Sequence, residues 1–308
     1  GITQWLMLRE YTADGLLAYP NFLETSIQIA PMYVFRVFGG LLYFIGLVLF
    51  VVNIFKTMKS GKIVANEPAE APALVNLEKR SPEKETWHRW LERKGVRFSL
   101  VVFVALIIGG IVEIVPMLKV ESNIPKIEAV TPYSPLELAG RDVYIANGCY
   151  NCHSQQIHPL RWETERYGEY SKIGEFVYDY PFQWGSRRTG PDLARAGYVG
   201  SSTYKTGIWH YNHFANPTDM NPQTIMPSYS WLEKKDVNLD MIPKKIRAMQ
   251  SLGVPYPEGF DEIAVDDYMK QAKVIVDDLK NSGVEVEPTK EVIAVIAYLH
   301  KLGRDISK

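Results

Sequence analysis

The sequence predicts two transmembrane α-helices joined to a mainly α-helical, loop-rich soluble domain. Uninterrupted apolar stretches at residues 37–55 and 98–118 predict the membrane part, because each is near the roughly 20 residues that a helix needs to cross a bilayer. A change of composition predicts the soluble part. From Pro132 onward the chain is rich in Tyr, Trp, Pro and Gly, and helical periodicity alternates with loops.

The two apolar stretches are interpreted as spans and not as core helices. A helix buried in a large soluble domain is the alternative, but such a helix seldom lacks a polar face. Glu113 is the one charged residue inside the second span. An intramembrane carboxylate indicates a functional role, although Glu113 lies close enough to the end of the span to reach headgroups or a neighbouring subunit.

Basic residues between the spans predict the orientation of the chain. Ten Lys and Arg side chains lie between residues 56 and 97, which places this connection in the cytoplasm, and its middle, residues 67–73, resembles a flexible linker. The segment before Val37 and everything after Leu118 then lie in the periplasm or on the outer face of a bacterial inner membrane. The net charge of −1 argues against nucleic-acid binding.

Within the soluble domain, apolar periodicity predicts helices at residues 136–147, 264–281 and 289–302. Thr289 and Glu291 are expected to open the last helix and Gly303 to end it. Residues 155–235 are expected to be mostly loop.

The strongest chemical signal is the motif that ends in His153. The only two cysteines, Cys149 and Cys152, lie three positions apart with His153 directly after them. Thiols at this spacing add across the two haem vinyl groups and place the histidine under the iron. A zinc half-site or a redox thiol pair is the alternative, but no second Cys pair exists. We therefore expect one covalent haem c in a mainly α, loop-rich cytochrome c domain.

An electron-transfer haem needs a second axial ligand, and methionine raises the reduction potential. Five methionines follow the motif, at positions 220, 226, 241, 249 and 269. Met226 is the preferred candidate because Pro227 makes its loop rigid. Met220, in the same loop region, is the main competitor, since helical methionines more often belong to the core.

Three further positions are expected to contact the haem or its ligand. Pro191 is expected to supply the carbonyl that accepts the free ring N–H of His153. Arg187 and Arg188 precede that turn, and either one could pair with a haem propionate or remain a solvated surface residue. The other histidines of this region are interpreted as packing residues in preference to ligands; they are His158, His210 and His213.

The run from Gly140 to His153 resembles the amino-terminal helix and haem motif of monohaem c-type cytochromes. Further segments resemble the monohaem subunit of cbb3-type cytochrome c oxidases, and they extend from about residue 86 to the end. These segments are 109–116, 165–168, 174–179, 181–186, 188–195, 209–213, 216–217 and 226–227.

The first sixty residues instead resemble the last helix of that oxidase's catalytic subunit, at residues 22–25, 36–46 and Asn53. The simplest interpretation is a fusion of the two subunits. In it, residues 1–60 are an outer segment and transmembrane helix, 61–97 a cytoplasmic linker, 98–118 the anchor and 119–308 the outer cytochrome c domain.

Two further observations concern the amino-terminal piece. No histidine precedes His88, so this piece cannot itself hold the oxidase's haem b or copper through imidazole. The sequence opens at Gly1 without an initiator Met or a cleavable signal, and we expect it to start inside a longer precursor.

The resemblance implies an electron relay in aerobic respiration. Single electrons would arrive from a dihaem cytochrome c subunit or a soluble cytochrome c and leave for the haem-copper catalytic subunit, which reduces oxygen and pumps protons. Nothing on this chain would activate oxygen, because His153 and Met226 would fill both axial positions.

Other functions remain open at this point. They are a tethered shuttle between a quinol-oxidising complex and another acceptor, an assembly protein or haem sensor, and the small cytochrome subunit of a nitric oxide reductase. The long segment 155–235 favours a permanent docking surface over a compact shuttle.

Overall fold

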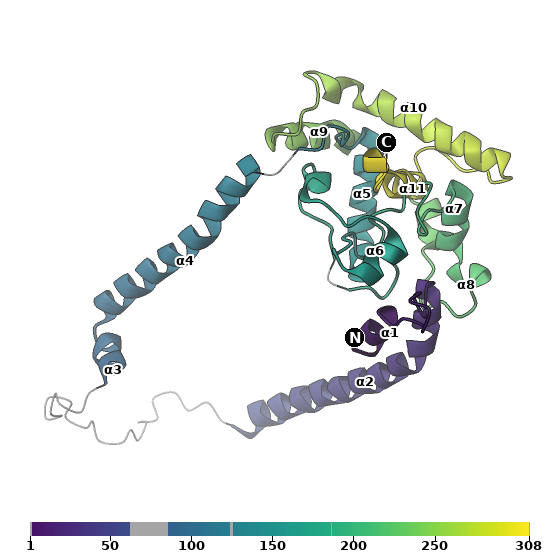
Figure 1. Cartoon of the computed structure of the whole chain (residues 1–308). Helices are drawn as coiled ribbons and strands as arrows, with labels where there is room; N and C mark the ends of the chain where they lie inside the picture. The colour runs from purple at the N-terminus through teal and green to yellow at the C-terminus, as the bar shows by residue number, and fades with distance from the viewer. Residues whose placement is uncertain (1, 62–85, 124–125, 186, 308) are drawn as a thin grey trace, which may run out of the picture. The chain divides into compact units, whose positions relative to one another are not determined.

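The computed structural model describes residues 2–61, 86–123, 126–185 and 187–307 (Figure 1). Over these residues the chain is helical and loop-rich, with no strand beyond two isolated bridges, and two helices are long and apolar enough to cross a membrane. The predicted fold class is confirmed. The expected linker at 67–73 lies outside the described residues.

The chain divides into two compact units, one of residues 1–36 with 125–308 and the other of residues 37–124. The second unit holds most of helix α2 (Phe22–Ser60), the short helix α3 (Trp87–Glu92) and helix α4 (Gly95–Asn123). None of the residues in the apolar windows of α2 and α4 is buried, as expected of helices whose solvent is lipid. Glu113 lies exposed on α4.

Helix α2 begins well before the predicted span at Val37. Its first turns lie in the other unit and bury Phe22, Thr25 and Ile29 there. The negative charge of Glu24 in the first turn is stabilised by the positive end of the helix dipole. The sequence pattern missed this extension because these turns are amphipathic and not uniformly apolar.

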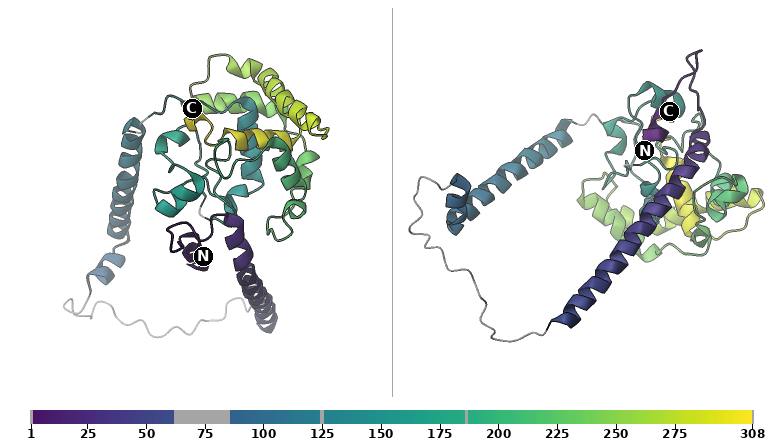
Figure 2. Two further views of the ribbon diagram at one scale, coloured as in Figure 1. Left: turned by 45° about the vertical axis from the view of Figure 1, so that its right-hand side comes forward. Right: turned by 90° about the horizontal axis from the view of Figure 1, so that it is seen from below.

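The expected cytochrome c domain lies in the first unit and is built from helices around the pair α5 and α11. The bounds are α5 Pro135–Ala146, α6 Arg161–Tyr167, α7 Gly207–Ala215, α8 Pro217–Met220, α9 Ile242–Ser251, α10 Phe260–Asn281 and α11 Glu291–Lys301, with α1 at Ile2–Leu8. Helices α9, α10 and α11 pack together with α5 (Figures 1 and 2). The three predicted helices of this domain are present, and between 155 and 235 only short helices interrupt the loops.

The ends of these helices have local physical causes. Ser134 caps α5 by accepting from the Glu137 backbone N–H, and the Glu137 carboxylate accepts the Ser134 N–H in return. The predicted start of the last helix at Thr289 is wrong by two residues. The Thr289 hydroxyl donates to Asp236 at 2.6 Å instead of capping the helix, and α11 begins at Glu291.

The central contact of the domain is the crossing of α5 and α11 at Gly140. A Cβ atom added to Gly140 would lie 1.8 Å from the Ala294 carbonyl oxygen and 2.9 Å from the Tyr298 Cβ. Because the obstacle is backbone, the two helices can approach this closely only when residue 140 is glycine. This crossing fixes the direction in which α5 presents the haem motif that follows it.

We expect Gly140→Ala to lower the stability of the domain by at least about 1–3 kcal/mol, the usual cost of an overpacked core contact. Thermal unfolding of the purified full chain, followed by circular dichroism, measures this. Gly207→Ala is the matched control, since its Cβ would meet nothing closer than 3.4 Å. Equal melting temperatures for the two variants would contradict the close-crossing argument.

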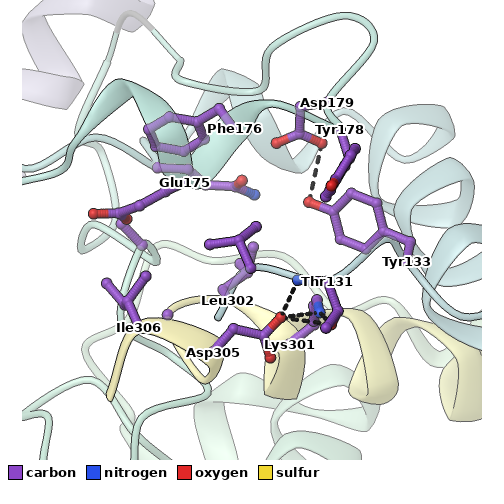
Figure 3. Close-up of a pocket in the computed structure, with 14 residues that line it drawn as sticks. Thr131, Tyr133, Glu175, Phe176, Tyr178, Asp179, Lys301, Leu302, Asp305 and Ile306 are labelled. Carbon is purple, nitrogen blue, oxygen red and sulfur yellow. Dashed lines mark hydrogen bonds and ion pairs between the residues drawn. The ribbon is translucent and has the colours of Figure 1, made fainter. Parts of the chain in front are cut away.

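A small cavity of about 50 Å³, lined by both polar and apolar side chains, lies near the end of α11 (Figure 3). On one side Tyr133 donates to Asp179 at 3.0 Å, and on the other the Thr131 backbone N–H donates to Asp305 at 2.9 Å. Burial alone would raise the pKa of Asp305, but the hydrogen bonds from Lys301 and Thr131 lower it to about 2. Hydrogen bonds already satisfy the carboxylates on both sides of the cavity. These bonds link α11 to the chain that enters α5, and the cavity has room for ordered water.

Candidate haem site

The haem motif is held by a tight turn directly after α5. Gly148 adopts a left-handed conformation with φ of 67°, which glycine adopts without strain. The 3₁₀ turn Cys149–Asn151 follows, and the backbone N–H groups of Cys152 and His153 both donate to the Cys149 carbonyl, at 3.1 and 3.0 Å. The turn brings both thiols and the imidazole to the wall of one cavity.

That cavity has a volume of about 810 Å³, within the range of roughly 300–1,000 Å³ that is typical of cofactor and small-molecule sites. Both candidate axial methionines, Met220 and Met226, line it together with His153. Apolar and aromatic side chains make up much of its wall; they include Tyr144, Leu193, Trp209, Phe214, Val295 and Leu299.

The His153 ring is fixed on its far side by the turn at 190–192. Its Nδ1 lies 2.8 Å from the Pro191 carbonyl oxygen. Because a carbonyl only accepts, Nδ1 carries the proton in the neutral ring, and the lone pair of Nε2 stays free for a metal. Burial lowers the pKa of His153, which favours the neutral form that ligates.

Gly190 leaves the space that this ring occupies. A Cβ on Gly190 would lie 2.3 Å from His153 Cε1 and 2.7 Å from Nδ1. The Gly190 N–H donates to the Cys152 carbonyl at 2.8 Å, so the turn is bonded directly to the haem motif. Asp192 secures the turn by accepting from the Ser154 hydroxyl at 2.5 Å and from its own neighbour, the Ala194 N–H, at 2.8 Å.

The buried thiol of Cys149 does not resemble the reactive thiol of a redox pair. Burial raises the pKa of Cys149 to about 12, whereas a redox-active Cys pair depends on a depressed pKa. Within the described residues, no cluster of three His, Cys, Asp or Glu side chains could hold a metal ion. The geometry therefore favours the covalent haem interpretation over both alternatives.

The structure separates the five methionines. Met226 is half-buried and packs against the main core, and Met220 ends α8 with 39% of its surface exposed. The remaining three do not line the cavity: Met249 and Met269 belong to the core packing, and Met241 is exposed.

The two arginines expected at a propionate are not brought to the cavity. Arg187 is exposed, and Arg188 forms ion pairs with Glu163 at 2.7 Å and Asp192 at 3.4 Å. Neither lines the cavity, whereas Arg166 and Lys205 do. No local sequence signal marks Arg166 and Lys205 as cavity residues, because each reaches the cavity only through the folding of a loop-rich region.

Two of the three remaining histidines line the cavity. His210 Nε2 and His213 Nδ1 are buried and have no hydrogen-bond partner in the described structure. Burial lowers the pKa of His210 to about 3 and that of His213 to about 4, so both rings are neutral donors or acceptors at pH 7. His158 instead lies 3.0 Å from Glu163 and does not line the cavity.

These observations fit a haem. The donor set at the cavity contains an imidazole with a free Nε2, two methionine sulfurs and two thiols at the attachment spacing. The largely apolar and aromatic wall of this cavity matches the surroundings that a buried cofactor requires. His153 would hold the iron from one side, and Cys149 and Cys152 would hold the porphyrin edge.

Comparison with known proteins relates the chain to two oxidase subunits. It is 40% identical over 73 residues to the cytochrome c oxidase subunit 1 homolog of Azorhizobium caulinodans, covering 24% of this chain and 13% of that protein. It is also 40% identical over 75 residues to the bacteroid cytochrome c oxidase subunit 1 homolog of Bradyrhizobium diazoefficiens, covering 23% and 14%. The chain thus spans about one seventh of the length of these relatives.

A family model named FixO, the mono-heme subunit of cytochrome c oxidase, matches residues 88–306. The match includes α4 and the whole haem motif, and it confirms the resemblance read from the sequence. Because it extends over well more than half of the sequence, this chain belongs to the FixO family of mono-heme cytochrome c oxidase subunits.

Proposed function

We propose that this chain is the electron-relay subunit of a cbb3-type cytochrome c oxidase. The observation that carries the proposal is the single cavity that both cysteines, His153 and Met226 line, in a chain of the mono-heme family. Haem iron supplies a one-electron couple when bound. Cys149 and Cys152 would attach the porphyrin covalently, and His153 and Met226 would hold the iron.

The protein residues set the conditions for a fast, reversible electron transfer. Pro191 keeps the His153 ring in one orientation, and a fixed ligand limits reorganisation when the iron changes charge. Apolar walls restrict water, and a methionine ligand favours the ferrous state. With His153 and Met226 as its ligands, the iron would serve electron transfer in preference to oxygen binding.

We further propose the partners and topology that the family implies. Electrons come from a dihaem cytochrome c subunit or a soluble cytochrome c and pass to the haem-copper catalytic subunit, which reduces oxygen and pumps protons. Both α2 and α4 cross the bacterial inner membrane, residues 61–97 lie in the cytoplasm, and the haem domain lies in the periplasm. The basic residues of that connection support this orientation.

Similarity to two different oxidase subunits supports the fusion proposal. The family model covers residues 88–306, and about a quarter of the chain is similar to relatives named subunit 1. We propose that residues 1–60 derive from the carboxyl end of the catalytic subunit and that residues 98–118 and 119–308 are the anchor and cytochrome domain of the monohaem subunit.

The test is a reduced-minus-oxidised spectrum of the purified complex, with pyridine haemochrome analysis and identification of the subunits that co-purify. We expect one haem c covalently attached to this chain and a haem-copper catalytic subunit in the same preparation. Absence of covalent haem from this chain would refute the proposal. A haem c without a catalytic subunit would favour the tethered shuttle.

A further inference from the structure

The first residues of the chain form a folded segment that packs on the cytochrome domain. We call residues 2–26 the amino-terminal segment. After α1 the chain turns back on itself: Tyr11 and Leu17 form an antiparallel bridge, and the Ala18 N–H donates to the Glu10 carbonyl at 2.8 Å. The segment then enters the first turns of α2. It therefore has a defined shape that can complement another surface.

Apolar burial attaches this segment to the domain. Leu8 and Phe22 are 4% and 7% exposed, and they form one cluster with Ile157, Tyr167 and Ala194 of the cytochrome domain. Such an intramolecular contact, between residues more than 130 positions apart, resembles a small interface with apolar anchors at its centre.

Arg166 on α6 is the polar centre of the same contact. It is 5% exposed, and its guanidinium donates to the carbonyl oxygens of Leu8 at 3.1 Å and Tyr19 at 2.6 Å. No ion pair with a carboxylate is found for it in the described part of the chain. A buried cation without a counter-ion needs such acceptors. Through these two hydrogen bonds, Arg166 holds both ends of the stretch from Leu8 to Tyr19 that precedes α2.

The fastened segment is also part of the haem cavity. Residues 20–23 and Ser26 line that cavity beside Arg166. The guanidinium is thus shared between the wall formed by the amino-terminal segment and α6, and its Nε is buried with no hydrogen-bond partner among the described residues.

We propose that Arg166 is a positioning residue that closes the haem cavity: its two terminal nitrogens hold the amino-terminal segment in place as one wall of that cavity. This inference rests on the proposed haem function. The first turn of α2 is then part of the haem's surroundings. If this wall is loosened, water enters the cavity and the reduction potential of the haem falls.

The test compares Arg166→Gln and Arg166→Lys with wild type in the purified complex. We expect hydrogen–deuterium exchange in residues 2–22 to become roughly tenfold faster or more in Arg166→Gln, together with a lower haem midpoint potential. Arg166→Lys keeps the charge but not the fork, so both values should fall between those of wild type and Arg166→Gln. Arg247→Gln is the matched control, because the Arg247 side chain on α9 is 55% exposed, pairs with Asp261 and does not line the cavity.

Leu8→Ala provides a second route to the same state if Arg166→Gln reduces the yield of folded complex. It loosens the segment from its own side and leaves α6 intact, and we expect the same two changes. Exchange and potential that stay at wild-type values would overturn the inference, and so would faster exchange at an unchanged potential, which would make the contact structural only. Absence of haem c from the wild-type complex would instead refute the proposed function. The exchange of residues 2–22 would still show whether Arg166 holds the amino-terminal segment.

Discussion

Substituting Gly190 by alanine is expected to abolish haem ligation by His153. The new Cβ would lie 2.3 Å from His153 Cε1. Ordinary contacts begin at 3.4 Å, so the ring must retreat by about 1.1 Å. Metal–ligand distances tolerate only about 0.2 Å, and the hydrogen bond to the Pro191 carbonyl restrains the ring. We therefore expect loss of the low-spin absorption spectrum and a large drop in oxidase activity.

The measurement is the optical spectrum of the purified Gly190→Ala complex, normalised to covalent haem by pyridine haemochrome analysis. Pro191→Ala is the matched control, because it alters the neighbouring position but keeps the backbone carbonyl that accepts from His153. We expect its spectrum to stay close to that of wild type. A wild-type spectrum for Gly190→Ala would mean that His153 does not occupy this position in the mature protein.

The sequence was sufficient wherever structure depends on local pattern. Two apolar stretches of near-membrane length predicted α2 and α4, and the spacing of Cys149, Cys152 and His153 predicted the chemistry of the site before its geometry was known. The carbonyl of Pro191 also lies where the sequence placed it, 2.8 Å from His153 Nδ1, because a proline-fixed turn leaves the chain few alternatives.

Features that depend on long-range contacts could not be predicted in the same way. Arg188 was a candidate for the propionate, but Glu163 and Asp192 compete for its guanidinium, and nothing in the local sequence shows which acidic groups will be near. The role of Arg166 requires contacts to Leu8 and Tyr19, about 150 residues away. Helix α9 is a different case, because its buried residues Ile242, Ile246 and Met249 have helical spacing, which is a local pattern.

The contact between the amino-terminal segment and the haem cavity gives the proposed fusion a physical meaning. The amino-terminal segment contacts the cytochrome domain through side-chain hydrogen bonds and a small apolar cluster. Such contacts work equally well between separate chains. An interface between two subunits can therefore become intramolecular by fusion without a change in its chemistry.

Met226→Leu is expected to remove the second axial ligand and to lower the midpoint potential of the haem by on the order of 100 mV or more, since axial ligands alone span about 0.8 V. The loop around Met226 is fixed at several points. The Met226 N–H donates to the Thr224 hydroxyl at 3.2 Å, the Ser228 hydroxyl donates to the Ala215 carbonyl at 2.7 Å, and the Tyr229 N–H donates to the Phe214 carbonyl at 2.8 Å. A sulfur presented by such a loop loses little conformational entropy on binding iron.

Met220→Leu is the matched comparison, because Met220 lines the same cavity but ends the four-residue helix α8 and is 39% exposed. Potentiometric titration of both variants, with the near-infrared charge-transfer band of Met-ligated ferric haem as a second readout, decides between them. We expect the band to disappear and the potential to fall only in Met226→Leu. The opposite result would transfer the ligand to Met220. Retention of the band in both single variants would require a different sixth ligand or an exchange between the two sulfurs, which the double variant would reveal, and the neutral rings of His210 and His213 would then be the next groups to replace.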